Sequence, residues 1–290
     1  MRKYLLTLAW LCYSITGFSQ DGFIEGKPRL AYWLLGSKPQ VVIVLHGGAA
    51  AQHWYLRPEF DALQESARII YYDQRGCGES ERDSSYLWQD HVTDLHRLIK
   101  TLSPLQKVVL AGSSWGSLLA MLYAYSHPED VKGLILTGTV EWKGREESFL
   151  RNGTGYGQLS KLTMQEKRLV FNYDTNRLIK VDTITVSKQF EIQFGSPQHE
   201  TLLSMQSAPK PERLRKLRMP ILIFSGTSNY NRKTGERSDW LDQYVNLFPH
   251  AQFHTLNMAG HDPWLSDPNQ FFTISNQFIR TISQSNINSK

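Results

Sequence analysis

The sequence predicts an α/β protein with a mostly parallel, doubly wound β-sheet and a mainly helical segment inserted into it. Three observations predict this class. Short apolar runs recur along the chain, helical patterns lie between them, and this alternation stops once, over residues 139–218. The 290 residues are enough for one large domain with such an insertion, and we see no internal repeat.

The strands are expected where consecutive residues are apolar. Residues 41–45 read Val-Val-Ile-Val-Leu, and similar runs follow at 68–72, 107–111, 133–136 and 220–224. Strands of a parallel sheet are covered on both faces, so they are apolar throughout rather than at alternate positions. A β-hairpin is expected before these runs, over residues 22–35, and a last strand over residues 252–256.

Helices are expected between the strands, where apolar residues recur every three or four positions. One stripe runs from Val92 to Leu102, a second begins at Leu118, and a third covers residues 241–247. A final helix contains Phe271 and Ile279. Strand and helix therefore alternate, as they do in a doubly wound sheet.

Residues 139–218 interrupt this alternation. They are rich in charged residues, Asn, Gln and Tyr, and contain no clear buried strand, although residues 162–171 have a helical pattern. We predict a cap inserted over the carboxyl edge of the sheet, where open α/β sheets bind their ligands. The core then comprises residues 20–138 and 219–290.

The first 19 residues have the pattern of a secretory signal peptide. Arg2 and Lys3 precede an apolar stretch over residues 4–13, and Gly17 and Ser19 supply small residues before a cleavage site at Gln20. The apolar stretch is too short to span a bilayer. We therefore expect an exported protein, periplasmic or extracellular, with no membrane span in the mature chain.

Charge and cysteine content narrow the function classes. The formal net charge of +5 includes Arg2 and Lys3 and is spread evenly, so it does not indicate a nucleic-acid partner. The mature chain retains only Cys77, so no intramolecular disulfide is expected. The sequence shows no histidine or carboxylate cluster at metal-ligand spacing, so we expect neither a metal nor another cofactor.

Residues 112–116, Gly-Ser-Ser-Trp-Gly, fit the pattern G-x-S-x-G. They follow an expected strand and open an expected helix, which is the context of a nucleophile elbow. Ser114 is therefore the candidate nucleophile. His46-Gly47-Gly48 follows another expected strand, and backbone N–H groups there, Gly48 in particular, would bind a developing oxyanion together with the N–H of Trp115.

A late histidine completes the pattern. His261 follows the last expected strand and precedes the final helix. An imidazole is able to take the proton of Ser114 at neutral pH and later give it to the leaving group. His261 is therefore the candidate general base.

These motifs resemble those of the proline iminopeptidases and related α/β-hydrolases. Residues 73–80, Asp-Gln-Arg-Gly-Cys-Gly-Glu-Ser, are similar to the segment after a core strand in that family, and residues 112–117 to its nucleophile segment. The resemblance covers residues 22–138 and 219–284. It implies an α/β-hydrolase fold and a peptidase or esterase that acts through an acyl-enzyme. One difference is that Ala49 and Ala50 stand where the family's oxyanion loop usually continues with Pro-Gly.

The resemblance also locates the third member of a catalytic triad. The family has an aspartate three residues after the glycine that ends the strand near residue 224, and counting from Gly226 gives Asn229. Replacing Asp by Asn in this role can lower the rate by about 10⁴. Glu141, or else Asp239 or Asp242, is an alternative acid. Otherwise Asn229 occupies the acid position and the enzyme is slow or inactive.

The sequence therefore predicts a serine hydrolase that cleaves an ester or amide bond of a small molecule or short peptide. An aminopeptidase of the proline iminopeptidase type is the first candidate, and a carboxylesterase or lactonase is the second. A catalytically impaired hydrolase fold that binds a ligand under its cap is the alternative from another class.

Overall fold

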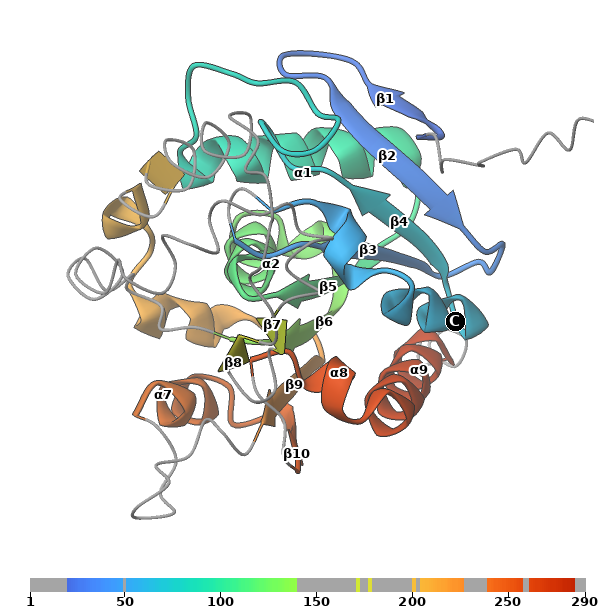
Figure 1. The fold of residues 1–290 in the computed structure, drawn as a ribbon. Helices are drawn as coiled ribbons and strands as arrows, with labels where there is room; N and C mark the ends of the chain where they lie inside the picture. The colour runs from blue at the N-terminus through green and yellow to red at the C-terminus, as the bar shows by residue number, and fades with distance from the viewer. Residues whose placement is uncertain are drawn as a thin grey trace, which may run out of the picture.

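A single eight-stranded sheet forms the centre of the molecule (Figure 1). The computed structural model describes residues 20–48, 51–139, 171–172, 177–178, 200–201, 204–226, 239–257 and 261–284. The strand order is β1-β2-β4-β3-β5-β6-β9-β10. Strands β1 and β2, and β2 and β4, pair antiparallel, while every other neighbouring pair in this sheet is parallel. The predicted fold class is confirmed.

The strands agree with the expected runs, with small shifts at their ends. The hairpin consists of β1 (Gly22–Ile24) and β2 (Leu30–Leu35), and β3 covers Val41–Leu45 as expected. Strands β5 and β6 extend further toward their carboxyl ends than the apolar runs do, because small or polar residues there still pair. The remaining strands are β4 (Arg68–Tyr72), β5 (Val108–Ser113), β6 (Val131–Thr137), β9 (Ile221–Gly226) and β10 (Gln252–Leu256).

Helices cover both faces of the sheet, which explains why its strands are apolar throughout. Alternate residues of β3 point to opposite faces: Ile43 belongs to one buried cluster and Val42 to the other. The first cluster includes residues of α1 (Trp88–Leu102), α2 (Trp115–Ser126) and α7 (Asp239–Leu247). The second includes residues of the 3₁₀ helix η2 (Glu59–Glu65), α8 (Pro263–Ser266) and α9 (Pro268–Gln284).

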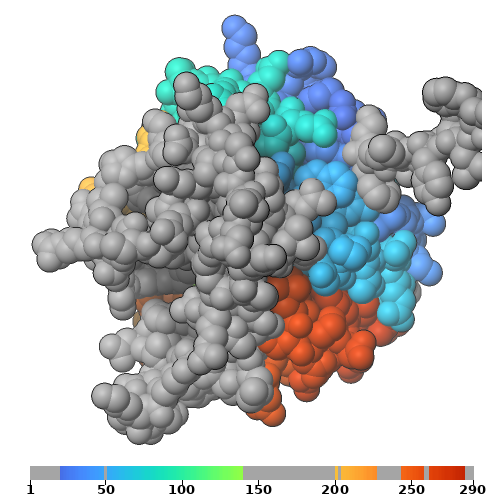
Figure 2. All heavy atoms as spheres, in the orientation of Figure 1, coloured from blue at the N-terminus to red at the C-terminus, as the bar shows by residue number. Residues whose placement is uncertain are grey.

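Aromatic packing joins the C-terminal helices to the segment between β3 and β4. The ring of Phe60 lies 5.3 Å from that of Trp264 and 5.4 Å from that of Phe272, both edge to face. In the space-filling view of Figure 2, the red C-terminal helices lie directly beside the light-blue residues near position 60. These contacts hold α8, which begins two residues after His261, against the rest of the core.

The predicted cap lies mostly outside the described residues. Within residues 139–218 the structure describes a two-stranded antiparallel ladder, β7 (Phe171–Asn172) with β8 (Arg177–Leu178), and the 3₁₀ helices η4 (Met205–Ser207) and η5 (Pro211–Lys216). The prediction of a helix over residues 162–171 is wrong at its last residue, because Phe171 lies in β7 and pairs with Leu178 of β8. The rest of that segment and the predicted signal peptide lie outside the described residues. Within the described part of the chain, no helix is long and apolar enough to cross a membrane.

Candidate active site

Two connections at the centre of the sheet carry the candidate nucleophile and the glycine loop. Strand β3 pairs with β4 on one side and β5 on the other, so chain connections leave it in both directions. Ligands of open α/β sheets bind at such a switch point, beyond the carboxyl ends of the strands. The loop after β3 begins at His46, and β5 leads into Ser114.

Ser114 has an unusual backbone conformation. Its φ of 54° and ψ of −119° make it the sole non-glycine residue with a positive φ among the described residues. It lies between β5 and α2, and its N–H donates to the carbonyl of Thr137 at the end of β6 over 3.0 Å. Strain of this kind persists where the surrounding structure enforces it, which is typical of functional sites.

The flanking glycines are required by close backbone contact. A Cβ on Gly112 would collide with the backbone of Gly116, and a Cβ on Gly116 would collide with the carbonyl of Leu45 in β3. The hydroxyl of Ser117 donates to the carbonyl of Gly112 over 2.7 Å and also lies 2.8 Å from that of Thr137. The sequence G-x-S-x-G therefore forms a tight turn that places Ser114 at the N-terminus of α2.

The glycine loop after β3 lies against Ser114. A Cβ on Gly47 would lie 2.9 Å from the Cβ of Ser114. The Gly47 N–H donates to the hydroxyl of Tyr55 over 2.7 Å, and Gly48 has a positive φ of 57°. The Gly47 N–H is thus engaged by Tyr55, and the next N–H group along this loop belongs to Gly48. The first N–H groups of a helix have no acceptor within the helix, so Trp115 at the start of α2 offers a second donor.

Gln74 links the two segments that carry these donors. Its side-chain N–H donates to the carbonyl of His46 over 2.8 Å, and its side-chain oxygen accepts from the indole N–H of Trp115 over 2.8 Å. All three residues are buried. One amide side chain therefore fixes the loop after β3 relative to the start of α2.

The His46 side chain stabilises the same loop in its neutral form. Its Nδ1–H donates to the Gly47 carbonyl over 3.1 Å, while its Nε2 accepts the backbone N–H of Gln74 over 3.0 Å. Burial lowers its pKa to about 4, although the nearby Asp73 acts in the opposite direction. At neutral pH the imidazole is therefore uncharged, and its two nitrogens serve as one donor and one acceptor.

The structure brings His261 to the same end of the sheet. A Cβ on Gly138 would lie 2.7 Å from the His261 carbonyl oxygen and 3.4 Å from the ring atoms Cε1 and Nε2. Gly138 directly follows Thr137, whose carbonyl accepts the Ser114 N–H. Ser114 and His261 thus both lie against the end of β6. His261 is an exposed residue.

The expected positions of the acid lie outside the described residues. Asn229 and Glu141 are among them, and for Asp239 and Asp242 the structure describes the backbone at the start of α7 but not the side chains. The carboxylate or amide that orients His261 therefore stays a prediction.

The segment Asp73-Gln74-Arg75 has a structural role that the sequence pattern did not reveal. Asp73 accepts the ring Nδ1–H of His53 over 2.9 Å, in a pair that is almost completely buried. Arg75 donates from Nε to Asp94 of α1 over 2.8 Å. Together with Gln74, these side chains connect the loop after β4 to the segment after β3, to α1 and to α2. Tyr55 and Gln74 were missed by sequence reasoning because their contacts span 8 to 41 residues.

Comparison with known proteins agrees with the observed fold. Residues 40–268 match the model of the α/β hydrolase fold family. The chain therefore belongs to the α/β-hydrolase family, and its general class is that of the hydrolases.

Within that family, several relatives share one name. The chain is 25% identical over 271 residues to a proline iminopeptidase of Heyndrickxia coagulans, an alignment that covers 83% of this chain and 91% of the relative. Among solved structures, it is similar to the proline iminopeptidase of Mycobacterium smegmatis, with a TM-score of 0.65, 18% identity and coverage of 91% and 99% of the two chains. It is also similar to a thermophilic esterase of Thermogutta terrifontis, with a TM-score of 0.63, 20% identity and coverage of 88% and 94%. The predicted resemblance to proline iminopeptidases is confirmed.

Proposed function

We propose that this chain is an exported serine hydrolase that cleaves an ester or amide bond of a small substrate through an acyl-enzyme on Ser114. The observation that carries this proposal is the strained backbone of Ser114 between β5 and the N-terminus of α2. A serine with a merely structural role at a strand–helix turn would not require a positive φ. The adjoining glycine loop and the nearby His261 support the same function.

The proposed reaction has two steps. The Oγ of Ser114 attacks the substrate carbonyl carbon while His261 takes the hydroxyl proton, and the N–H groups of Gly48 and Trp115 bind the resulting oxyanion. The tetrahedral intermediate collapses, the bond to the amine or alcohol breaks, and His261 donates the proton to that leaving group. Water then attacks the acyl-enzyme by the same route, which releases the acid and regenerates Ser114.

An orienting group on the other nitrogen of His261 would make this proton transfer efficient. Asn229 is the position that the family resemblance implies, and Glu141, Asp239 and Asp242 are the alternative acids. If Glu141 is the acid, Glu141→Gln lowers turnover by orders of magnitude and Asn229→Ala changes it little. If Asn229 occupies the acid position, Asn229→Asp raises turnover, since a carboxylate stabilises imidazolium better than an amide does.

An aminopeptidase that removes an N-terminal proline or another small residue is the first candidate within this class. Its support is the name shared by the relatives and the motifs at residues 73–80 and 112–117. A carboxylesterase or lactonase is the second candidate, because Ala49 and Ala50 replace the Pro-Gly usual in the iminopeptidase oxyanion loop. The substrate in either case is a small molecule or short peptide.

The direct test is labelling with a fluorophosphonate probe, which reacts with an activated serine. We expect rapid labelling of the mature chain and none of Ser114→Ala, with Ser113→Ala as the matched control. Equal labelling of Ser114→Ala would place the nucleophile elsewhere, and no labelling of any folded form would favour the impaired ligand-binding protein. Prolyl-amide and short acyl-ester substrates then separate the two candidates, since turnover of esters alone would reject the peptidase.

Export has its own test. The full chain is expressed in a bacterial host, and the N-terminus of the protein recovered outside the cytoplasm is sequenced. Cleavage after Ser19 gives Gln20 as the first residue. An intact chain that begins at Met1 and stays in the cytoplasmic fraction would contradict export.

A further inference from the structure

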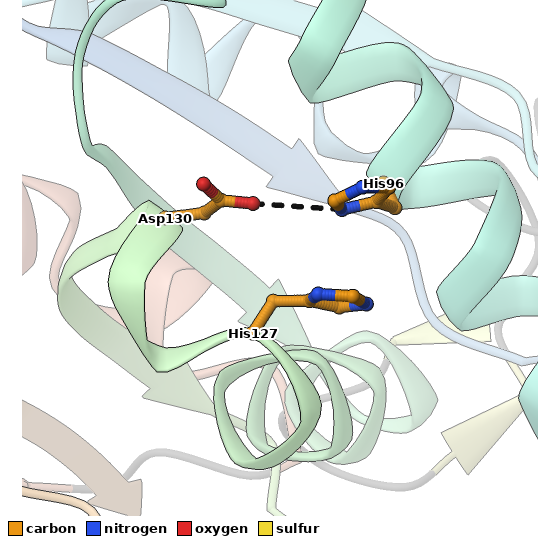
Figure 3. Close-up of side chains that lie close together, drawn as sticks. All are labelled: His96, His127 and Asp130. Carbon is orange, nitrogen blue, oxygen red and sulfur yellow. Dashed lines mark ion pairs between the residues drawn. The ribbon is translucent and has the colours of Figure 1, made fainter.

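Three side chains with metal-binding groups lie together at the end of α2 that is remote from Ser114 (Figure 3). His96 comes from α1, His127 directly follows α2, and Asp130 ends the short 3₁₀ helix η3 (Pro128–Asp130). One ligand atom from each residue lies within 4.8 Å of those of the other two. The sequence did not reveal this group because the chain places His96 far from the other two.

The three side chains lie side by side, with the two imidazoles stacked on one another. The imidazole rings of His96 and His127 are stacked, with centroids 4.1 Å apart and planes inclined by 21°. The Asp130 carboxylate lies beside them, with its Oδ2 3.5 Å from the Nδ1 of His96. Figure 3 shows that the carboxylate points from η3 toward the imidazole of His96.

We propose that His96, His127 and Asp130 bind a zinc ion. Imidazole nitrogen and carboxylate oxygen are ligands that Zn²⁺ prefers, at about 2.0–2.2 Å, and water completes a tetrahedral set. The group must contract by roughly 1 Å to reach these distances. The histidine side chains are 34% and 28% exposed, so both are able to turn toward an ion that arrives from solvent.

Two neighbours contact the carboxylate of Asp130, one at each oxygen. The hydroxyl of Tyr123 lies 2.9 Å from Asp130 Oδ2 and 3.0 Å from His96 Nδ1, so it connects two of the proposed ligands. The ammonium group of Lys100 pairs with the other oxygen, Oδ1. The Tyr123 contact is of the kind that orients ligands in metal sites, whereas the ammonium group of Lys100 competes with a cation for the carboxylate. The carbonyl end of α2 adds a partial negative charge that favours a cation.

This site is separate from the proposed chemistry of Ser114. Helix α2 has 12 residues and starts directly after Ser114, so its length of about 18 Å separates the two sites. The proposed ion would instead connect α1 to η3 and to the end of α2. A ligand that binds the folded state and not the unfolded state raises the midpoint of thermal unfolding.

Isothermal titration calorimetry with ZnCl₂ tests the proposal on the mature, untagged chain after treatment with EDTA and dialysis. We expect one equivalent of zinc per chain and a rise in the thermal midpoint with Zn²⁺ but not with Mg²⁺. Each of His96→Gln and His127→Gln should weaken binding by roughly 10- to 100-fold or more. His250→Gln, at an exposed histidine outside the group, is the matched control. Absence of binding would overturn the proposal. So would a variant with both His96→Gln and His127→Gln that binds zinc as tightly as the unmodified chain.

A second variant keeps the test decisive if a histidine variant fails to fold. Lys100→Gln removes a positive charge that pairs with Asp130 and would repel Zn²⁺. At this exposed position the change should tighten zinc binding by about 10-fold. An unchanged or weaker affinity in folded Lys100→Gln would place any bound zinc elsewhere and so reject this site.

Discussion

The indole N–H of Trp115 donates a hydrogen bond to the side-chain oxygen of Gln74 over 2.8 Å. The other end of the same amide donates to the carbonyl of His46, two residues before Gly48. The two proposed oxyanion donors, Gly48 and Trp115, belong to different segments of the chain. Their separation therefore depends on a side chain that touches neither donor N–H group.

Gln74→Met tests this dependence. Methionine has a similar length but cannot make either hydrogen bond, so the loop after β3 and the start of α2 become free to shift. Loss of a whole oxyanion donor costs about 10² to 10³ in rate, and we expect a misplaced donor to cost roughly 10- to 100-fold. Steady-state kinetics on an ester substrate should show this loss in kcat, with KM changed little.

Gln106→Met is the matched control, because Gln106 is exposed in the loop between α1 and β5. We expect its kcat to equal that of the unmodified chain. A Gln74→Met enzyme with an unchanged kcat and only a lower thermal midpoint would show that Gln74 stabilises the fold without positioning the donors.

Tyr55→Phe addresses the other support of the glycine loop. The Tyr55 hydroxyl accepts the Gly47 N–H over 2.7 Å, so its removal leaves this N–H without its partner. A buried donor that loses its acceptor costs about 1–3 kcal/mol. Urea denaturation should show a decrease of this size in the free energy of unfolding, together with a lower kcat. Tyr125→Phe, at a half-buried tyrosine of α2, should change both quantities by much less; equal effects would contradict the assigned role of Tyr55.

The layers of the fold were predictable because each rests on a local pattern. Residues 41–45 are apolar throughout since both faces of β3 are covered, and the stripe from Val92 to Leu102 marks the buried side of α1. The strand–turn–helix around Ser114 was predictable for the same reason, because its glycines and its flanking elements are adjacent in sequence. Within the sheet the strand ends shifted by one or two residues, and at the carboxyl ends of β5, β6 and β9 the pairing continues past the last large apolar residue.

The rest depended on contacts that no short segment contains. Gln74 lies 41 residues from Trp115, and His96 lies 31 and 34 residues from His127 and Asp130, so composition and spacing do not indicate that they meet. A polar side chain in a loop has the same appearance in sequence whether it is solvated or connects two segments. The sequence resemblance suggested that residues 73–80 matter, but the structure was needed to show which contacts these residues make.

Ser114→Gly should make the protein more stable while it abolishes turnover. A side chain at φ 54° and ψ −119° is strained by about 1–3 kcal/mol, and glycine relieves this strain, although it increases the entropy of the unfolded chain. We expect the free energy of unfolding to rise by roughly 1 kcal/mol in urea denaturation. Ser114→Ala is the control, since it removes the hydroxyl but keeps the Cβ. If both variants had the same stability, the backbone strain at Ser114 would be negligible.

Stability should fall between pH 6.5 and pH 4 because of His46. Burial lowers the pKa of His46 from its ordinary value of 6.5 to about 4, so in this range the unfolded chain binds a proton that the folded chain excludes. Over the full range, protonation of this residue lowers the free energy of unfolding by roughly 3 kcal/mol. The buried His91, whose pKa burial also lowers, acts in the same direction. Urea denaturation at pH 7, 5.5 and 4.5 measures the effect, and His46→Gln should be less stable at pH 7 but have a shallower pH dependence. An equal slope in His46→Gln would show that protonation of His46 does not drive the loss of stability at low pH.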